Sequence, residues 1–381
     1  MKIRIVYKQI PNQKLLGVFH ILFPFSISYL LTPLICRLAE KLRILDIPDK
    51  RKVHHIATPL LGGVVIYLAF AIGTVTTQWY SVEFKTIVYA ATLIFILGLM
   101  DDIMKLSSVL RLTIQVLAVF ILFTQGMEIN FLPDFTRLRI LDKLITILWI
   151  VGITNAVNFL DGLDGLCVGF GVIASLFFGA IAFLTGQYFF MFLAFSLAGS
   201  CLGFLPWNFR LNKPARIFMG DAGSLFIGFT LASFAIMGEW AENKTVALFV
   251  PVLILLLPIF DISMITFFRI KDGAVKTVRE WFDYVGKDHF HHRLYDFGIS
   301  KKKVVWIMYL LTALLGFSAV IIRTSGTMEA YLELLQAITL LIIFISFIVI
   351  ARKRCDIIVK ESKKMSIAPD ENDPQNSERQ S

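Results

Sequence analysis

Long apolar runs with almost no charged residues recur along this 381-residue chain. A helix needs about 20 apolar residues to cross a bilayer, and only segments that satisfy their own backbone hydrogen bonds are stable in lipid. We therefore predict an all-α integral membrane protein, a bundle of about 11 transmembrane helices. The runs cover approximately residues 15–36, 60–78, 84–100, 110–126, 144–160, 165–185, 187–205, 222–238, 246–268, 304–322 and 332–350.

The composition excludes several other classes of protein. Hydrophobic residues make up 57% of the chain and charged residues 17%, whereas soluble domains average about half apolar and about a quarter charged. The net charge is +9, but in a membrane protein basic residues gather on cytoplasmic loops, so we expect no nucleic-acid partner. The four cysteines lack the spacing of a zinc finger or a disulfide framework.

The distribution of Lys and Arg predicts the orientation. Most of the 37 basic residues fall in six segments that share one side if loop 37–59 is cytoplasmic. The positive-inside rule then places the N-terminus outside and the C-terminus inside, although four lysines and arginines near the N-terminus disagree locally. We expect a catalytic transmembrane domain over residues 1–350 and a polar, disordered cytoplasmic tail over 351–381.

Five polar clusters fall on the predicted cytoplasmic face. In the first, residues 46–63, Lys52 belongs to a basic loop that is either an ordinary positive-inside loop or a phosphate clamp, and Gly62-Gly63 would let the backbone approach a ligand. In the second, Asp101 and Asp102 directly follow an apolar run. They are either an end-of-helix pair offset by Lys105 or a metal or catalytic carboxylate pair.

The third cluster places Asn155 and Asn158 one helical turn apart, before Asp161-Gly162 and Asp164-Gly165. It lacks the ligand ladder of a calcium loop, and a simple helix end would not need so many polar groups. In the fourth cluster, Asp221 is either a helix N-cap or a metal ligand at a helix start that favours phosphate.

The fifth cluster contains three histidines and an arginine in the sequence HFHHRL. No cysteine or glutamate completes a zinc site, so these side chains better suit a pyrophosphate or a sugar. Asp261 lies inside a predicted span, where a carboxylate usually has a partner, but the sequence does not identify one. The candidate residues of this cluster are His289, His291, His292 and Arg293.

The chain resembles the polyprenyl-phosphate N-acetylhexosamine-1-phosphate transferase family, and among its members the bacterial undecaprenyl-phosphate N-acetylglucosamine-1-phosphate transferases. The resemblance rests on six motifs in order between residues 46 and 294: DIPDKRKVHH–TPLLGG, GLMDDIMKL, NAVNFLDGLDGL, ARIFMGDAGSLFIGF, PIFD and HFHHRL. It implies a multi-pass enzyme of the bacterial inner membrane with its active site on the cytoplasmic face. Such an enzyme transfers a sugar 1-phosphate from a UDP-sugar to undecaprenyl phosphate and releases UMP.

The resemblance also implies roles for individual residues. Asn158 and Asp221 match the ligands of Mg²⁺, for which Mn²⁺ is an alternative ion. Asp101 and Asp102 match the paired aspartates, whose role as base, nucleophile or phosphate-positioning group stays open. Asp161 and Asp164 match positions near the nucleotide and complete the catalytic set. The expected substrate-binding residues are Lys52, Lys105, Arg111, His289, His291, His292 and Arg293.

The resemblance leaves the donor sugar and the assembly open. Phe290 interrupts the histidine run that is typical of the MurNAc-pentapeptide enzymes, so GlcNAc is the first choice, with GalNAc or a 6-deoxy sugar behind it. The oligomeric state also stays open, and a homodimer is one alternative. The rival functions are a secondary transporter, which would place its polar groups near mid-membrane, and a membrane protein that binds lipid head groups through basic loops. The second rival does not explain the aspartates and asparagines.

Overall fold

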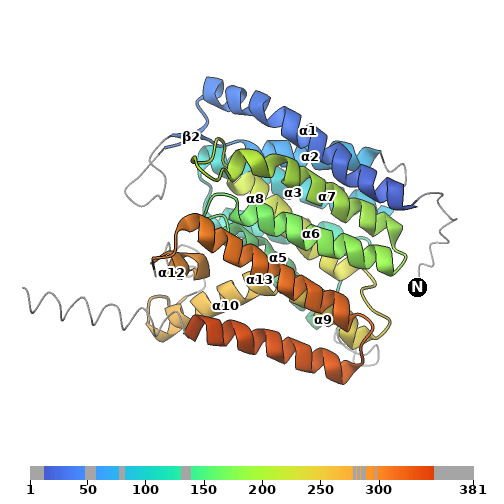
Figure 1. Ribbon diagram of the computed structural model, residues 1–381. Coiled ribbons are helices and arrows are strands. Elements are labelled where there is room, and N and C mark those ends of the chain that lie inside the picture. The colour runs from blue at the N-terminus through green and yellow to red at the C-terminus, as the bar shows by residue number, and fades with distance from the viewer. Residues whose placement is uncertain are drawn as a thin grey trace, which may run out of the picture.

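The computed structural model describes residues 13–47, 57–76, 82–129, 139–277, 280, 284, 289–296 and 298–346. The basic loop around Lys52 and the tail 351–381 lie outside the described residues. Where the chain is described, it is almost entirely helical, with one two-stranded antiparallel sheet (Figure 1). The elements are α1 (Gln13–Leu42), β1 (Leu45–Asp46), β2 (Thr58–Pro59), α2 (Gly62–Val75), α3 (Val82–Met104), α4 (Ser108–Phe123), α5 (Arg139–Phe159), α6 (Leu166–Leu184), α7 (Tyr188–Asn208), α8 (Gly220–Met237), α9 (Lys244–Ile254), α10 (Leu256–Lys271), α12 (Phe290–Asp296), α13 (Lys301–Ile322) and a last helix, Thr327–Ser346.

The prediction of an all-helical, multi-pass protein is confirmed, and within the described residues the predicted apolar runs fall on helices. Eight of these helices are long and apolar enough to cross a membrane. Two further runs form shorter helices, α2 with 14 residues and α4 with 16. The remaining run is broken into α9 and α10, which are bent by 74°. The count of 11 spans and the orientation of the termini remain predictions.

The bend between α9 and α10 has a local cause in the sequence. Pro258 has no backbone N–H, so it cannot donate to the carbonyl four residues earlier, on the far side of the break. Pro251 lies inside α9, and Leu255 forms the junction between the two helices. The chain therefore changes direction inside an otherwise continuous apolar run, and this new direction carries Asp261 in α10.

Helix α8 is the central element of the bundle. Its apolar window is 83% buried, the largest share among the candidate spans, and it packs against α2, α3 and α5. On the other side of the bundle, α7 packs between α1 and α6 (Figure 1). Because other helices surround α8, the backbone N–H groups of its first turn need hydrogen-bond partners from neighbouring elements of the chain. That first turn is the fourth polar cluster of the sequence.

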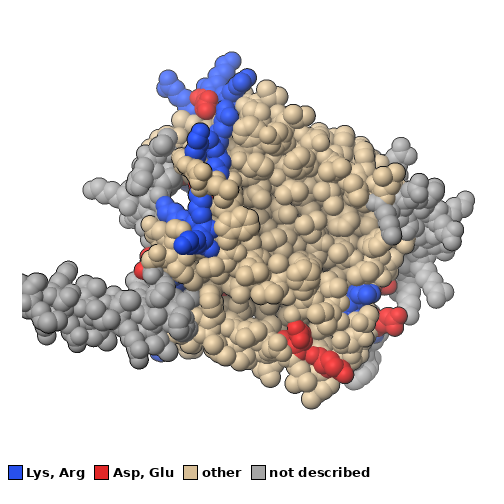
Figure 2. All heavy atoms as spheres, viewed as in Figure 1, with Lys and Arg blue, Asp and Glu red and all other residues tan. Residues whose placement is uncertain are grey.

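Charged residues are distributed unevenly over the surface. In the view of Figure 2, Lys and Arg form a band along one edge of the molecule, and acidic residues lie near the opposite corner. The end of α1, the loop between α7 and α8 and the start of α13 supply exposed or half-buried basic residues at the band's end of the bundle. They are Arg37, Lys41, Arg43, Arg210, Lys213, Arg216, Lys301, Lys302 and Lys303.

Candidate active site

The start of α8 is held by a carboxylate from another helix. Asp102, near the end of α3, accepts hydrogen bonds from the backbone N–H groups of Asp221 (2.8 Å) and Ala222 (3.1 Å). The first N–H groups of a helix have no partner within the helix, and a negative charge is favourable there. Asp102 therefore caps α8 from outside. The helical spacing suggested an ion pair between Asp102 and Lys105. In the structure Asp102 faces α8, and Lys105 is exposed just beyond the end of α3.

Glycines allow the close packing around this turn. Gly220 has φ +72°, and a Cβ atom there would collide with the Asp102 carboxylate. A Cβ on Gly98 of α3 would lie 2.5 Å from the backbone oxygen of Asp221, and one on Gly63 would overlap the α8 backbone. Gly62 and Gly63 also donate to the carbonyls of residues 218 and 219. The sequence predicted that Gly62 and Gly63 let the backbone come close to a ligand. In the structure, they let it come close to the backbone at the start of α8.

The predicted metal ligands Asn158 and Asp221 are in contact. Asn158, at the end of α5, donates from Nδ2 to Asp221 Oδ1 (2.7 Å) and to Ser224 Oγ (2.8 Å). The side-chain oxygen of Asn158 accepts no hydrogen bond from the described residues. The Asp221 side chain is 35% exposed, so it borders open space. The amide oxygen of Asn158 and the partly exposed carboxylate of Asp221 therefore belong to two side chains in direct contact.

The other member of the aspartate pair orients an arginine. Asp101 is buried, with its Oδ1 accepting from Leu106 N–H (2.7 Å) and its Oδ2 paired with Arg111 Nη1 (2.9 Å). The same Nη1 lies 4.0 Å from Asp221 Oδ2, and the Arg111 side chain is 32% exposed. The guanidinium is therefore held beside the Asn158–Asp221 pair with one side facing outward, which places it where an anion could be bound.

The loop between α5 and α6 carries two aspartates with different surroundings. Asp164 accepts from the backbone N–H of Ala215 (3.1 Å), which ties this loop to the α7–α8 connection. Gly165 has φ +83°, and its N–H donates to the side chain of Asn208 (2.8 Å). Asp161 is exposed. The structure thus gives Asp164 a structural contact and leaves Asp161 open to solvent.

The partner of Asp261 comes from the histidine cluster. Asp261 is 1% exposed, and its Oδ2 lies 2.9 Å from His289 Nδ1, while its Oδ1 accepts from the Phe290 backbone N–H (2.6 Å). A carboxylate on Nδ1 fixes the orientation of an imidazole and leaves Nε2 to act. Asp261 therefore anchors the start of α12 to α10, a contact that the sequence alone did not reveal.

The other residues of the cluster differ in exposure. His291 is fully buried and its ring nitrogens have no hydrogen-bond partner in the described part of the chain, whereas His292 and Arg293 are half-buried. Burial and the neighbouring imidazoles of His292 and His289 hold the pKa of His291 well below its usual value. A Cβ on Gly162 would collide with the His291 ring, so α12 lies against the Asp161-Gly162 loop. The structure therefore brings the third and fifth clusters together.

The side-chain atoms that could bind a metal ion fit Mg²⁺ better than a transition metal. Among the described residues, no group of three His, Cys, Asp or Glu side chains could hold a metal ion. Mg²⁺, however, commonly takes one or two carboxylate ligands and completes its shell with waters and substrate phosphates. The open oxygens of Asn158 and Asp221 suit such a site, whereas Asn155 is engaged in an amide pair with Gln115 (2.7 Å).

The chain is similar in sequence to a known protein family and to several known proteins. Residues 84–239 match the family model described as glycosyl transferase family 4. A protein of Bacillus subtilis named as a probable undecaprenyl-phosphate N-acetylglucosaminyl 1-phosphate transferase is 32% identical over 318 residues, which cover 81% of this chain and 86% of that protein. The chain belongs to glycosyl transferase family 4. The matched region contains both aspartate pairs, Asn158 and Asp221, whereas α12 lies outside it.

Other relatives in the family differ in the substrates that their names give. The decaprenyl-phosphate N-acetylglucosaminephosphotransferase of Mycobacterium leprae is 33% identical over 77% of this chain and 80% of its own length. A phospho-N-acetylmuramoyl-pentapeptide-transferase of Prochlorococcus marinus is 31% identical over 68% of this chain and 76% of its own length. Membership of the family thus confirms the resemblance seen in the six motifs.

Proposed function

We propose that this chain transfers N-acetylglucosamine 1-phosphate from UDP-GlcNAc to undecaprenyl phosphate in the presence of Mg²⁺. An oxygen of the lipid phosphate attacks the donor phosphorus that carries the sugar, and the bond between the two donor phosphates breaks. UMP leaves, and a lipid-linked pyrophosphate sugar remains. No proton has to be removed from the attacking oxygen, because a phosphate monoester has its second pKa near 6 and is largely dianionic at neutral pH.

The observation that carries this proposal is the contact between Asn158 and Asp221. Their side chains bring oxygen atoms that can bind a metal ion next to Arg111 at the start of α8. These two residues would hold Mg²⁺, which when bound would offset the charge of the donor phosphates and of the leaving UMP. Arg111 would bind a phosphate oxygen through its exposed side.

The remaining residues position these groups. Asp101 and Asp102 have both carboxylate oxygens engaged, so in this conformation each acts as a positioning group: Asp101 orients Arg111, and Asp102 fixes the first turn of α8. Asp261 orients His289 at the start of α12. His289, His292 and Arg293 would then contact the donor, while buried His291 supports the loop that carries Asp161.

The choice of donor rests on the relatives. Two relatives named as N-acetylglucosamine 1-phosphate transferases are 32% and 33% identical over 81% and 77% of this chain. Two named as pentapeptide-transferases are 31% and 28% identical over 68% and 82% of it, so the difference in identity is small. Phe290 interrupts the histidine run, as noted from the sequence. GlcNAc is therefore the donor that we propose, with the active site on the cytoplasmic side of a bacterial inner membrane. The basic band at the end of α1 and the start of α13 supports this orientation.

The test is release of UMP by the purified, lipid-replete protein. UDP-GlcNAc and undecaprenyl phosphate are supplied with Mg²⁺ or with EDTA, and UDP-GalNAc and UDP-MurNAc-pentapeptide are supplied in parallel. We expect UMP release from UDP-GlcNAc with Mg²⁺ and no release with EDTA. The Asp221→Asn variant should lose this release. The control Glu242→Gln, which removes an exposed carboxylate elsewhere, should keep it. Release from another donor instead would reject the GlcNAc assignment. No release from any donor would favour the transporter.

A further inference from the structure

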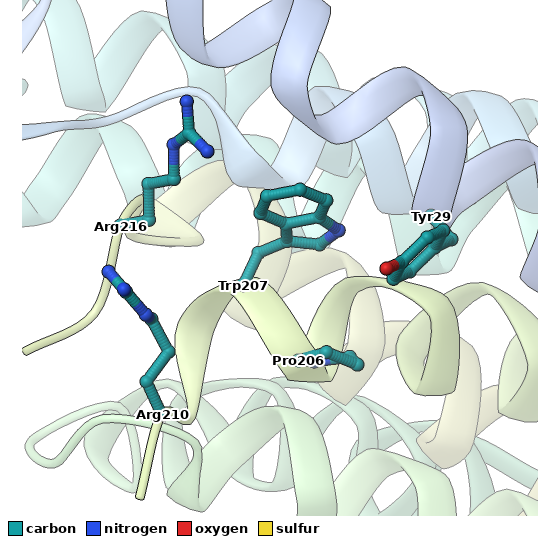
Figure 3. Close-up of a pocket in the computed structure, with 5 residues that line it drawn as sticks. All are labelled: Tyr29, Pro206, Trp207, Arg210 and Arg216. Carbon is teal, nitrogen blue, oxygen red and sulfur yellow. The ribbon is translucent and has the colours of Figure 1, made fainter. Parts of the chain in front are cut away.

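A polar pocket lies apart from the candidate active site. It has a volume of about 380 Å³ and is lined by Tyr29 of α1, by Pro206 and Trp207 at the end of α7, and by Arg210 and Arg216 of the connection to α8 (Figure 3). This volume falls within the range of about 300–1,000 Å³ that is typical of small-molecule sites. None of the groups assigned to the proposed reaction lines it.

The pocket offers hydrogen-bond donors and positive charge. Arg210 and Arg216 extend on one side of Trp207, and Tyr29 lies on the other (Figure 3). The indole Nε1 of Trp207 is buried and has no hydrogen-bond partner in the described part of the chain. Within the same residues, no carboxylate forms an ion pair with either arginine. The two guanidinium groups suit an anion with several oxygens, whereas the indole nitrogen lies on the Tyr29 side of the ring (Figure 3).

Each guanidinium group has one local contact, and the backbone of Arg216 has two more. The guanidinium of Arg216 lies 5.3 Å from the centre of the Trp207 ring, and its backbone N–H donates to the Trp207 carbonyl (2.9 Å). Its own carbonyl accepts from Cys36 of α1 (3.8 Å). Arg210 donates from Nη1 to the carbonyl of Pro214 (3.4 Å). Because less side-chain freedom is then lost, an anion binds more favourably.

The surroundings indicate that the anion belongs to a lipid. Tyr29 lies in the apolar span of α1, and Leu30 and Leu34 next to it are 68% and 57% exposed. Trp207 is close to the end of α7, and Trp and Tyr are enriched where spans meet the membrane surface. Basic pockets between transmembrane helices at such a boundary bind anionic lipid head groups. Acyl chains could therefore cover the exposed leucines while the phosphate reaches the arginines.

We infer that this pocket binds the phosphate head group of an anionic phospholipid, separately from the proposed substrates. The bound head group bridges α1 to the α7–α8 connection, the segment that leads into the first turn of α8. Lipid binding therefore stabilises the approach to the active site without taking part in the reaction. This inference does not depend on the identity of the donor or on the reaction itself.

The test compares two double variants that lose the same charge. Arg210→Gln/Arg216→Gln empties the pocket of its cations, and the control Lys41→Gln/Lys303→Gln removes two exposed lysines near it in the basic band. Phosphatidylglycerol or phosphatidylcholine is titrated into the full-length protein in detergent, and binding is followed by native mass spectrometry and by thermal unfolding. Inorganic phosphate and undecaprenyl phosphate are titrated in separate arms.

We expect phosphatidylglycerol, but not phosphatidylcholine, to bind the wild-type protein and raise its unfolding temperature. Loss of both arginines should weaken this binding about 30-fold, because each basic residue near an anionic surface contributes about a fivefold gain in affinity. The lysine variant should bind nearly as the wild type does. Equal weakening in both variants would overturn the inference, as it would show general charge attraction. Equal protection by inorganic phosphate, or protection by undecaprenyl phosphate alone, would overturn the assignment to a phospholipid.

Discussion

Replacing Asp102 by asparagine tests whether this carboxylate is required to hold the start of α8. The carboxylate accepts two backbone hydrogen bonds, from Asp221 and Ala222. Asparagine has a single acceptor oxygen, so one of the two N–H groups would face an NH₂ group instead. A buried donor left without a partner costs about 1–3 kcal/mol. Loss of the negative charge at a helix N-terminus costs about 0.3–1 kcal/mol more.

The expected total is about 1–4 kcal/mol of unfolding free energy, because these two effects act on the same turn. For a large domain, about 2 °C is lost per kcal/mol, so the unfolding temperature in detergent should fall by about 2–8 °C. UMP release should fall as well, because the turn that carries the Asp221 side chain is displaced. The control Glu242→Gln should change neither quantity.

The combination of the two measurements decides the role of Asp102. A variant that unfolds like the wild type but has lost its activity would refute our reasoning, since Asp102 would then act on the substrate and not on α8. A variant with unchanged stability and unchanged activity would remove Asp102 from the site altogether. Loss of stability together with partial loss of activity is the outcome that a positioning group requires.

Three further predictions follow from packing and charge. Gly98→Ala should destabilise the protein by about 1–3 kcal/mol, because its Cβ meets backbone that cannot move aside, whereas Gly152→Ala, with nothing within 4 Å, should be neutral or stabilising in thermal melts. Asp261→Asn should lower kcat/KM for the donor about 10–100-fold through the loss of a charged hydrogen bond to His289, and an unchanged value would contradict the positioning role. Because the folded protein keeps His291 neutral, stability should fall as the pH drops below 6.5, where the unfolded chain binds a proton; melts at pH 7.5 and 5.5 should show a smaller loss in His291→Gln.

Part of the site could be predicted from local sequence. Asp101, Asp102, Asn158 and Asp221 each stand where an apolar run meets a polar segment, and such positions are visible without any tertiary information. The structure brings all four together at the start of α8. It also gives Asp102 a role that spacing could not suggest, because its partners lie 119 and 120 residues away. Spacing along one helix pointed instead to Lys105.

Other features could not have been found from the sequence. The partner of Asp261 is 28 residues away, directly before α12, and the bend between α9 and α10 helps to set where Asp261 lies. The full burial of His291 accompanies its packing against the Asp161-Gly162 loop, whereas the sequence grouped it with the substrate-binding residues. The pocket of Arg210 and Arg216 depends on Tyr29 of α1, which no motif connected to it.

Hydropathy along the chain was enough to show that it is helical and embedded in a membrane, because this property acts over about 20 consecutive residues and needs no distant partner. The sequence also showed which polar residues stand at the ends of the helices. The tertiary structure alone decided which of these residues meet, which oxygens stay open and which helix is bent. These outcomes depend on contacts between segments far apart in the chain, where close packing and the pairing of buried polar groups select one arrangement.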